Sequence, residues 1–316
     1  MNFREMKSFS SQTKLMISGE YLVLKGALAL AIPLKFKQEI SVSEQSGTPS
    51  VRWKSLINNN LWFHTTLILP DLQIIETNEL NLAETLQKIL KAAKLLNFSF
   101  LGSSCEYQVN STMDFDPAWG IGSSSSLISN IAYWANCDAY ELNNLIFNGS
   151  GYDIASARSS SPIIYKLEDN KPSFRKANFH PGFNSQLYFI YLNRKQNSME
   201  SVGKADLSGV SSKDILEISA ITLGLEKATD LLTFRILMDR HEEILSKIIQ
   251  IKTVKSLFFS DFNGSVKSLG AWGGDFVLVA TEASEEYVRN YFITRNLNTI
   301  FRYDEIIRFQ ILRYPN

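Results

Sequence analysis

Residues 116–137 read DPAWGIGSSSSLISNIAYWANC, and this stretch is the best predictor of the fold of the chain. Two glycines follow Pro117, and four serines, Ser123 to Ser126, come directly after them. Apolar residues then recur at spacings of one, three and four, which is typical of a helix with one buried face. The serines therefore fall at a predicted helix start, where the first backbone N–H groups have no partner within the helix.

A glycine-rich turn before a helix start can bind an anion, because the backbone approaches the ligand closely and the helix dipole favours negative charge there. We therefore predict a phosphate-binding loop made of Gly120, Ile121, Gly122, Ser123, Ser124, Ser125 and Ser126. The same composition is also typical of a plain loop with a serine N-cap, and the stretch alone leaves this alternative open. No lysine follows the last glycine, so a lysine for the phosphates has to come from elsewhere in the chain.

The composition is that of an ordinary soluble globular protein. The chain has 316 residues, of which 45% are hydrophobic and 20% charged, and this length allows two domains or one large one. A polar stretch over 171–182 predicts a boundary between a domain over 1–182 and a domain over 183–316. Lys plus Arg and Asp plus Glu both number 32, so the net charge is zero. We therefore expect no nucleic-acid partner, although a local basic site is compatible with this balance.

Cysteine usage and the N-terminal segment both predict a cytoplasmic protein. Two cysteines, Cys105 and Cys137, are too few for a disulfide framework or a zinc site, and we expect both to be reduced. The N-terminal segment MNFREMKSFSSQTK lacks the apolar core of a signal peptide. No apolar run reaches the ~20 residues that a membrane span requires, so we expect no membrane partner. The sequence leaves the choice between monomer and homodimer open.

Strand patterns dominate the first part of the chain. Strands are predicted over 14–17, 21–24 and 36–42, and residues 82–96 form a clear amphipathic helix. A further strand over 105–113 leads into the serine loop. Strand runs that are followed by helix-rich segments predict an α+β fold.

Two long helical patterns, over 211–232 and 234–251, make the second half of the chain rich in helix. The second pattern contains the charged run Asp239–Glu243, with His241 inside it. We interpret this run as the solvent-exposed face of the helix.

Two further glycine-rich segments lie far from the serine loop in the sequence. SGEYLVLKG follows a predicted strand that carries Lys14, and SLGAWGGDFVLVAT, residues 268–281, is a glycine-rich turn into a predicted buried strand. In this order the three segments resemble the GHMP kinases, the superfamily of galactokinase, homoserine kinase, mevalonate kinase and phosphomevalonate kinase. The three segments together are far more specific than any one of them.

Each segment is similar to one motif of the family. KLMISGEYLVLKGALAL resembles the opening motif GKLxLxGEYxVLxG, GIGSSSS resembles the phosphate loop GLGSSAA, and SLGAWGGDFVLVA resembles GAGGGD. NGSGYDIASA resembles the NGSxGDxA segment of bacterial phosphomevalonate kinases. The shared positions are Lys14, Gly19, Glu20, Gly26, Gly120, Gly122, Ser123, Ser124, Asp153, Gly270, Gly273, Gly274 and Asp275.

The resemblance implies that Asp153 is the catalytic aspartate and that Lys14 keeps its carboxylate ionised. Without the resemblance, a helix N-cap is the better interpretation of Asp153. The family pattern further implies that residues 120–126 bind the phosphates of ATP with the glycines of the third motif, Gly270, Gly273 and Gly274.

The resemblance also implies positions for the metal and the substrate. Mg²⁺ is expected at Ser124 and at Glu141, which lies one residue from the place of the family's metal-binding glutamate. An anionic small-molecule substrate is expected at Glu20, Lys195 and Ser198. Arg158 lies one turn after Asp153, and this spacing predicts that it faces the same pocket. Composition alone allows a second interpretation of residues 194–198, as a solvated basic turn.

Several positions depart from the family pattern. Gln12 and Thr13 replace the usual Pro-Gly before the first lysine, and Trp119 precedes the loop. Ser125 and Ser126 replace the two alanines. Trp272 stands where the third motif usually has glycine, and its indole either narrows the phosphate site or stacks on the substrate.

The implied fold is an α+β fold of the GHMP kinase type, with an N-terminal domain similar to ribosomal protein S5 domain 2 and a ferredoxin-like C-terminal domain. The implied function is an ATP- and Mg²⁺-dependent kinase in isoprenoid precursor synthesis, with phosphomevalonate favoured as substrate by the NGSGYDIASA match. Three alternatives stay open: a mevalonate kinase, a diphosphomevalonate decarboxylase-like lyase, and a catalytically altered nucleotide-binding relative.

Overall fold

A computed structural model describes residues 6–102, 105–147, 149–169, 171–194, 206–270, 272 and 274–307. The chain divides into two compact units, and each is assembled from separate stretches of sequence. Unit 1 comprises Met1–Thr13, Phe36–Pro117 and Gly122–Arg158, and unit 2 comprises Lys14–Lys35, Ala118–Ile121 and Ser159–Asn316. The domain boundary predicted at residue 182 stays a prediction.

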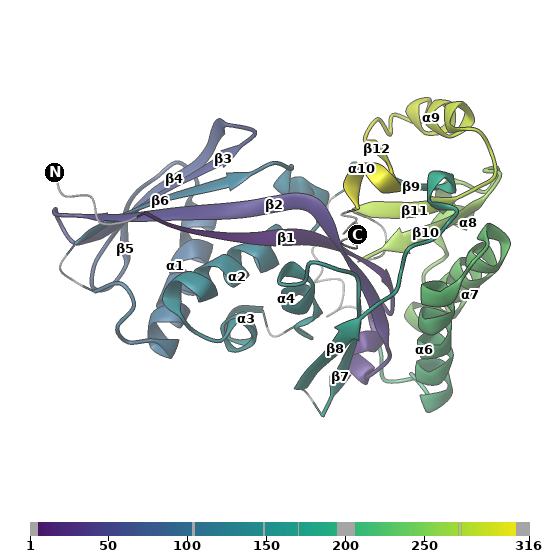
Figure 1. Ribbon diagram of the computed structural model, residues 1–316, viewed down its shortest axis with the longest axis horizontal. Helices are drawn as coiled ribbons and strands as arrows, with labels where there is room; N and C mark the ends of the chain where they lie inside the picture. The colour runs from purple at the N-terminus through teal and green to yellow at the C-terminus, as the bar shows by residue number, and fades with distance from the viewer. Residues whose placement is uncertain are drawn as a thin grey trace, which may run out of the picture. The chain divides into compact units, whose positions relative to one another are not determined.

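Unit 1 contains a sheet in the order β5-β4-β3-β6-β2 (Figure 1). β3 pairs with β6 in parallel, while β4 with β3, β5 with β4, and β6 with β2 pair antiparallel. β1 also pairs with β2, and both of these long strands have residues in both units. The strand bounds are β1 Lys7–Ser18, β2 Ala29–Gln45, β3 Ser50–Ile57, β4 Asn60–Ile68, β5 Gln73–Thr77 and β6 Glu106–Met113.

The helices of the described part of unit 1 pack their apolar faces against the sheet and form one core with it. The core joins Val51 and Trp53 of β3 to Leu86 and Leu90 of the first helix and Ile131 of the second. Alternate residues of β3 are buried, as expected of a strand with one covered face. The helices are α1 Leu80–Leu96, α2 Ser123–Ala135, α3 Ala139–Phe147 and α4 Tyr152–Ala157. The amphipathic helix predicted over 82–96 is confirmed as α1.

Unit 2 contains an antiparallel four-stranded sheet in the order β10-β11-β9-β12 (Figure 1). Val277 and Val279 of the central strand pack with Val288 and Phe292 on one face of this sheet. A hairpin of two further strands pairs with the first residues of β2. The strands are β7 Ile163–Glu168, β8 Lys171–Lys176, β9 Leu187–Tyr191, β10 Ser265–Leu269, β11 Phe276–Ala280 and β12 Ile300–Arg302.

The helices of unit 2 include the two long ones predicted from the sequence. They pack against each other, and the second also contacts β10. The bounds are α6 Ser212–Lys227, α7 Leu231–Ile249, α8 Val254–Phe258, α9 Glu285–Ile293 and α10 Tyr303–Ile306. No helix in the described part of the chain has both the length and the apolar character that crossing a bilayer requires.

Two local predictions are wrong. Residues 21–24 are not a strand, because Tyr21 adopts a left-handed backbone (φ 61°) and starts the short 3-10 helix η1, Leu22–Lys25. The charged run of α7 is not uniformly exposed, because His241 is fully buried and Glu242 is 2% exposed. Both buried side chains face polar or charged partners from other elements of unit 2, which the spacing along one helix does not reveal.

Candidate active site

The serine loop ends at the start of α2, as the sequence predicts. Gly120 and Gly122 both adopt left-handed backbones, with φ of 70° and 98°. Gly122 is the N-cap of α2 and no side chain caps this helix start, while Ser126 N donates to Gly122 O at 3.0 Å. The first N–H groups of a thirteen-residue helix therefore lack a capping side chain, which is the arrangement that binds anions.

The four serines at this helix start have different environments. Ser125 and Ser126 are buried, and their hydroxyls donate to Gly122 O at 2.9 Å and to Gln38 Oε1 of β2 at 2.7 Å, respectively. Ser124 is exposed. The two serines at the family's alanine positions therefore point inward within unit 1, whereas Ser124 is exposed and Ser123 is half-buried.

The preceding residues of the loop belong to unit 2 and are held by aromatic side chains. Tyr191 Oη donates to Ala118 O at 3.0 Å. The Trp119 ring packs edge-on against Phe276 and Phe301, with centroids 6.3 and 5.3 Å away. Trp119, a departure from the family pattern, thus anchors the loop to the sheet of unit 2.

Lys14 connects the first motif to the loop. Its backbone N–H donates to Ile121 O at 2.8 Å, and its side chain is only 7% exposed. β1 therefore carries the predicted catalytic lysine directly beside the glycine-rich loop.

The third motif lies against the same loop. A Cβ on Gly120 would overlap with the carboxylate of Asp275, which would have to move to make room for a side chain. Asp275 is itself held in a left-handed backbone with φ of 54°, where its N–H donates to Arg194 O at 2.6 Å and its C=O accepts from Leu192 N at 2.8 Å. This close approach requires glycine at position 120.

The first and third motifs also contact each other. Trp272 N donates to Tyr21 Oη at 3.0 Å, and the backbone of Gly270, with φ of 74°, hydrogen-bonds to the Glu20 carboxylate. Gly274 is buried in the same turn. Within unit 2, all three glycine-rich segments therefore meet, although they lie roughly a hundred residues or more apart in the sequence. Gly273 lies outside the described residues.

Glu20 is buried in an ionic environment. It is 2% exposed, and its carboxylate accepts from Lys267 Nζ at 2.5 Å. Burial raises the pKa of Glu20, and the nearby Lys267 ammonium opposes that rise. A direct contact between Glu20 and the substrate stays a prediction.

The predicted residues of unit 1 lie on its helices. Asp153 is half-buried in the first turn of α4, and Glu141 is exposed in the first turn of α3. Arg158 ends α4, where its Nε donates to Ser129 Oγ at 3.0 Å and its guanidinium stacks over the Tyr133 ring at 4.1 Å. Arg158 is thus held against α2.

Some predicted associations stay predictions. Asp153 belongs to unit 1 and Lys14 to unit 2, so their pairing is not established. Lys195 and Ser198 lie outside the described residues. Among the residues that are described, no group of three or more His, Cys, Asp or Glu side chains is arranged to hold a metal ion. The roles of Ser124 and Glu141 with Mg²⁺ therefore also stay predictions.

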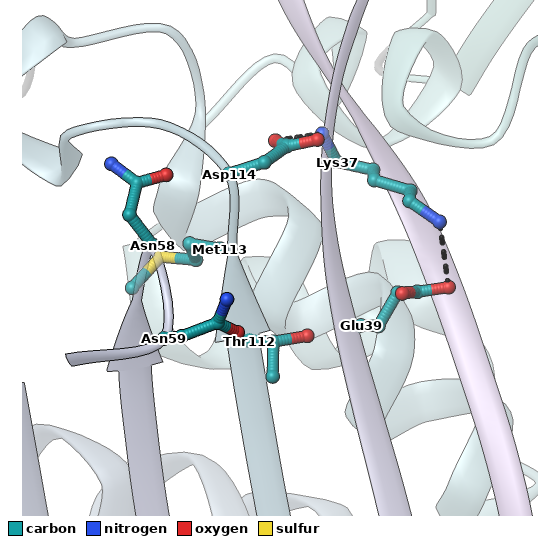
Figure 2. Close-up of a pocket in the computed structure, with 7 residues that line it drawn as sticks. All are labelled: Lys37, Glu39, Asn58, Asn59, Thr112, Met113 and Asp114. Atoms are coloured by element: carbon teal, nitrogen blue, oxygen red, sulfur yellow. Dashed lines mark hydrogen bonds and ion pairs between the residues drawn. The ribbon is translucent and has the colours of Figure 1, made fainter. Parts of the chain in front are cut away.

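A cavity of about 250 Å³ in unit 1 was not predicted from the sequence (Figure 2). Asn58 N donates to Met113 O at 3.0 Å, which brings the β3–β4 turn beside the end of β6. The Asn58–Asn60 run predicts the turn, but not its neighbour across the sheet. The lining residues are Lys37, Glu39, Asn58, Asn59, Thr112, Met113 and Asp114, and the last three come just before the serine loop.

Solved structures with the same fold include mevalonate kinases, phosphomevalonate kinases and a galactokinase. Mevalonate kinase of Methanococcus jannaschii is 18% identical with a TM-score of 0.69, over 97% of this chain and 99% of that one. Phosphomevalonate kinase of Streptococcus pneumoniae, with phosphomevalonate and AMPPNP, is 14% identical with a TM-score of 0.68, over 94% and 99%. Galactokinase of Lactococcus lactis, with galactose, is 11% identical with a TM-score of 0.64, over 95% and 93%.

At these identities the likeness establishes the fold alone. It confirms the predicted α+β fold of the GHMP kinase type, while the names given to the two domains stay predictions. Neither a protein-family model nor a curated protein sequence matches this chain.

Replacing Gly120 by alanine is expected to lower the free energy of unfolding by about 1–3 kcal/mol, because a left-handed backbone disfavours a side chain and Asp275 has to move. The control is Gly182→Ala, since a Cβ on Gly182 would meet no other atom within 4 Å. Chemical denaturation of both variants measures the difference. Equal stability of Gly120→Ala and the parent chain would contradict the close approach of the two turns.

Alanine variants of Ser124 and Ser126 are expected to differ in their free energy of unfolding. Ser126→Ala leaves Gln38 Oε1 buried without its donor, which costs about 1–3 kcal/mol of unfolding free energy. Ser124→Ala changes an exposed side chain and is expected to stay within about 0.5 kcal/mol of the parent. Thermal and urea unfolding of the two variants measures this difference. A larger loss of stability in Ser124→Ala than in Ser126→Ala would refute the inward-facing hydrogen bond of Ser126.

Proposed function

We propose that this chain is an ATP- and Mg²⁺-dependent kinase that phosphorylates a small anionic molecule, with phosphomevalonate as its substrate. The observation that carries the proposal is the meeting of the three glycine-rich segments within unit 2, through Lys14 with Ile121, Gly120 with Asp275, and Tyr21 with Trp272. Two left-handed glycines and an uncapped helix start then offer backbone N–H groups to phosphate oxygens.

Phosphoryl transfer depends mainly on positioning and on neutralising charge, and the described groups suit both tasks. The start of α2 binds the nucleotide's phosphates, and the turn after β10 completes their binding. Ser124 offers an exposed hydroxyl to Mg²⁺, and Glu141 offers a carboxylate. The metal, when bound, neutralises the charge on the phosphate oxygens.

Asp153 orients the attacking oxygen of the substrate and accepts its proton. Lys14 supplies a positive charge that stabilises the charge on the transferred group. The low exposure of Lys14, at 7%, favours a specific role for its ammonium over a general solubilising one.

The choice of phosphomevalonate rests on the NGSGYDIASA segment and on the likeness to the Streptococcus pneumoniae phosphomevalonate kinase. Arg158 and Lys195 are the proposed cations for the anionic acceptor. Mevalonate kinase is the second candidate, because the fold likeness to the Methanococcus jannaschii mevalonate kinase is equally strong.

The catalytic assignment predicts that Asp153→Asn and Lys14→Ala each lower kcat by about 10²–10⁴-fold, since a positioned acid or base contributes about that much. Circular dichroism is expected to show an unchanged fold. Matched controls are Asp71→Asn and Lys88→Ala, which alter residues of unit 1 outside the proposed site. Near-normal turnover in both test variants would remove the assignment.

The substrate assignment predicts ADP release with phosphomevalonate and none with mevalonate, homoserine or galactose. Purified protein, ATP and Mg²⁺ are assayed for ADP release with each acceptor, and a parallel assay with diphosphomevalonate measures evolved carbon dioxide. ADP release with mevalonate alone would show that mevalonate, and not phosphomevalonate, is the substrate. ADP release with galactose would show that the chain belongs to another branch of the superfamily. Carbon dioxide release would indicate the lyase, and nucleotide binding without any turnover would indicate a non-catalytic relative.

A further inference from the structure

We propose that four buried ionisable residues, Glu20, His241, Glu242 and Lys267, form a positioning network that fixes the third glycine-rich turn for nucleotide binding. The nucleotide-binding part of this inference rests on the proposed function. In this arrangement Glu20 acts through the backbone of the turn and not by touching the acceptor substrate.

The network holds the entry of the turn at successive backbone groups. Lys267 Nζ donates to Ser268 O at 2.8 Å, and Ser268 N donates to Glu242 Oε1 at 3.1 Å. The Gly270 backbone hydrogen-bonds to the Glu20 carboxylate. The two polar backbone groups of Ser268 and the backbone of Gly270 are thus each bound by a different member of the network.

The same network also holds the first motif. Gly19 N donates to His241 Nε2 at 3.0 Å, and this nitrogen lies 3.2 Å from Glu20 Oε2. His241 and Glu242 are neighbours on α7, so this helix contacts the turn after β1 and the turn after β10 at once. Gly19 leaves no space for adjustment, because a Cβ there would lie 2.6 Å from Leu28 O.

The four side chains are too deeply buried to serve solubility. Lys267 and His241 are fully buried, and Glu20 and Glu242 are each 2% exposed. Such an ionic cluster adds little stability compared with apolar residues of the same size, because removing charges from water is costly. The cluster instead provides directional hydrogen bonds: its donors and acceptors bind particular backbone groups, which apolar side chains cannot do.

The protonation states agree with this role. Burial raises the pKa of Glu242 to about 8, so this carboxyl is neutral at pH 7 and still accepts from Ser268 N. Burial lowers the pKa of His241 well below its ordinary value, so the imidazole is neutral and its Nε2 accepts from Gly19 N. This nitrogen therefore does not donate to Glu20 Oε2, and His241 holds the first motif through Gly19 alone. Lys267 Nζ lies 2.5 Å from Glu20 Oε1, and these two side chains form an ion pair.

Glu242→Gln and Glu242→Leu test the proposal as a matched pair. Glutamine keeps an acceptor for Ser268 N and matches the neutral carboxyl that the raised pKa favours, whereas leucine removes the acceptor for Ser268 N and also the backbone hydrogen bond with Val254. A non-hydrolysable ATP analogue with Mg²⁺ is expected to bind about tenfold more weakly to the leucine variant, which corresponds to one lost hydrogen bond. The glutamine variant is expected to bind within about twofold of the parent, and KM for phosphomevalonate is expected to stay unchanged in both.

Hydrogen–deuterium exchange of peptides that cover residues 268–275 gives a readout that needs no ligand. Exchange is expected to be faster in the leucine variant and unchanged in the glutamine variant. The double variant Glu20→Gln/Lys267→Met, which removes both charges together, is expected to fold and to show the same loosening at Ser268. It serves in place of the leucine variant should that chain not fold.

The outcomes separate the two proposals. A parent chain that binds no nucleotide would refute the proposed function, while the exchange measurement would still decide whether the network positions the turn. Equal exchange and equal nucleotide affinity in the folded leucine variant and the parent would overturn the network. Equal losses in the glutamine and leucine variants would also overturn it, because glutamine preserves the hydrogen bond.

Discussion

The contact between Gly120 and Asp275 is the constraint on which the candidate site depends. It joins the glycine-rich loop to the third motif at a distance that leaves no room for a side chain unless the Asp275 carboxylate moves, and both residues occupy left-handed backbones. The turn of the third motif is strained by itself, since Asp275 is not a glycine and yet has a positive φ. The strain is sustained because neighbouring backbone groups of Leu192 and Arg194 hold Asp275 from both sides.

Local features of the site could be predicted from the sequence because they depend on short-range chemistry. Glycines before a serine run and an apolar spacing after it determine a left-handed turn and a helix start, whatever surrounds them. Tyr21 shows the limit of this approach, since an apolar run that is typical of a strand becomes η1 once a left-handed residue precedes it. Periodicity predicts which residues are apolar neighbours, but it does not detect a single unusual φ.

Contacts between distant segments could be anticipated only through the family resemblance. Nothing in the α7 sequence distinguishes His241 and Glu242, which are buried, from Arg240 and Glu243, which form an ion pair at the surface. Their burial depends on Glu20 and Lys267, which come from segments more than twenty residues away in either direction. The sequence also did not predict the environment of each serine in the loop. Ser126 is distinguished by its hydrogen bond to Gln38 of β2, which lies far away in the sequence.

Trp272 illustrates how a departure from the family pattern is accommodated. Of the two sequence-based interpretations, stacking on a substrate requires an accessible ring, but this side chain is only 5% exposed. Its backbone N–H donates to Tyr21 Oη, so the residue is fixed to the first motif. A glycine at this position would keep the hydrogen bond and lose the packing of the indole. The tryptophan therefore adds buried apolar area to this turn, at the cost of an indole N–H that is buried without a hydrogen-bond partner.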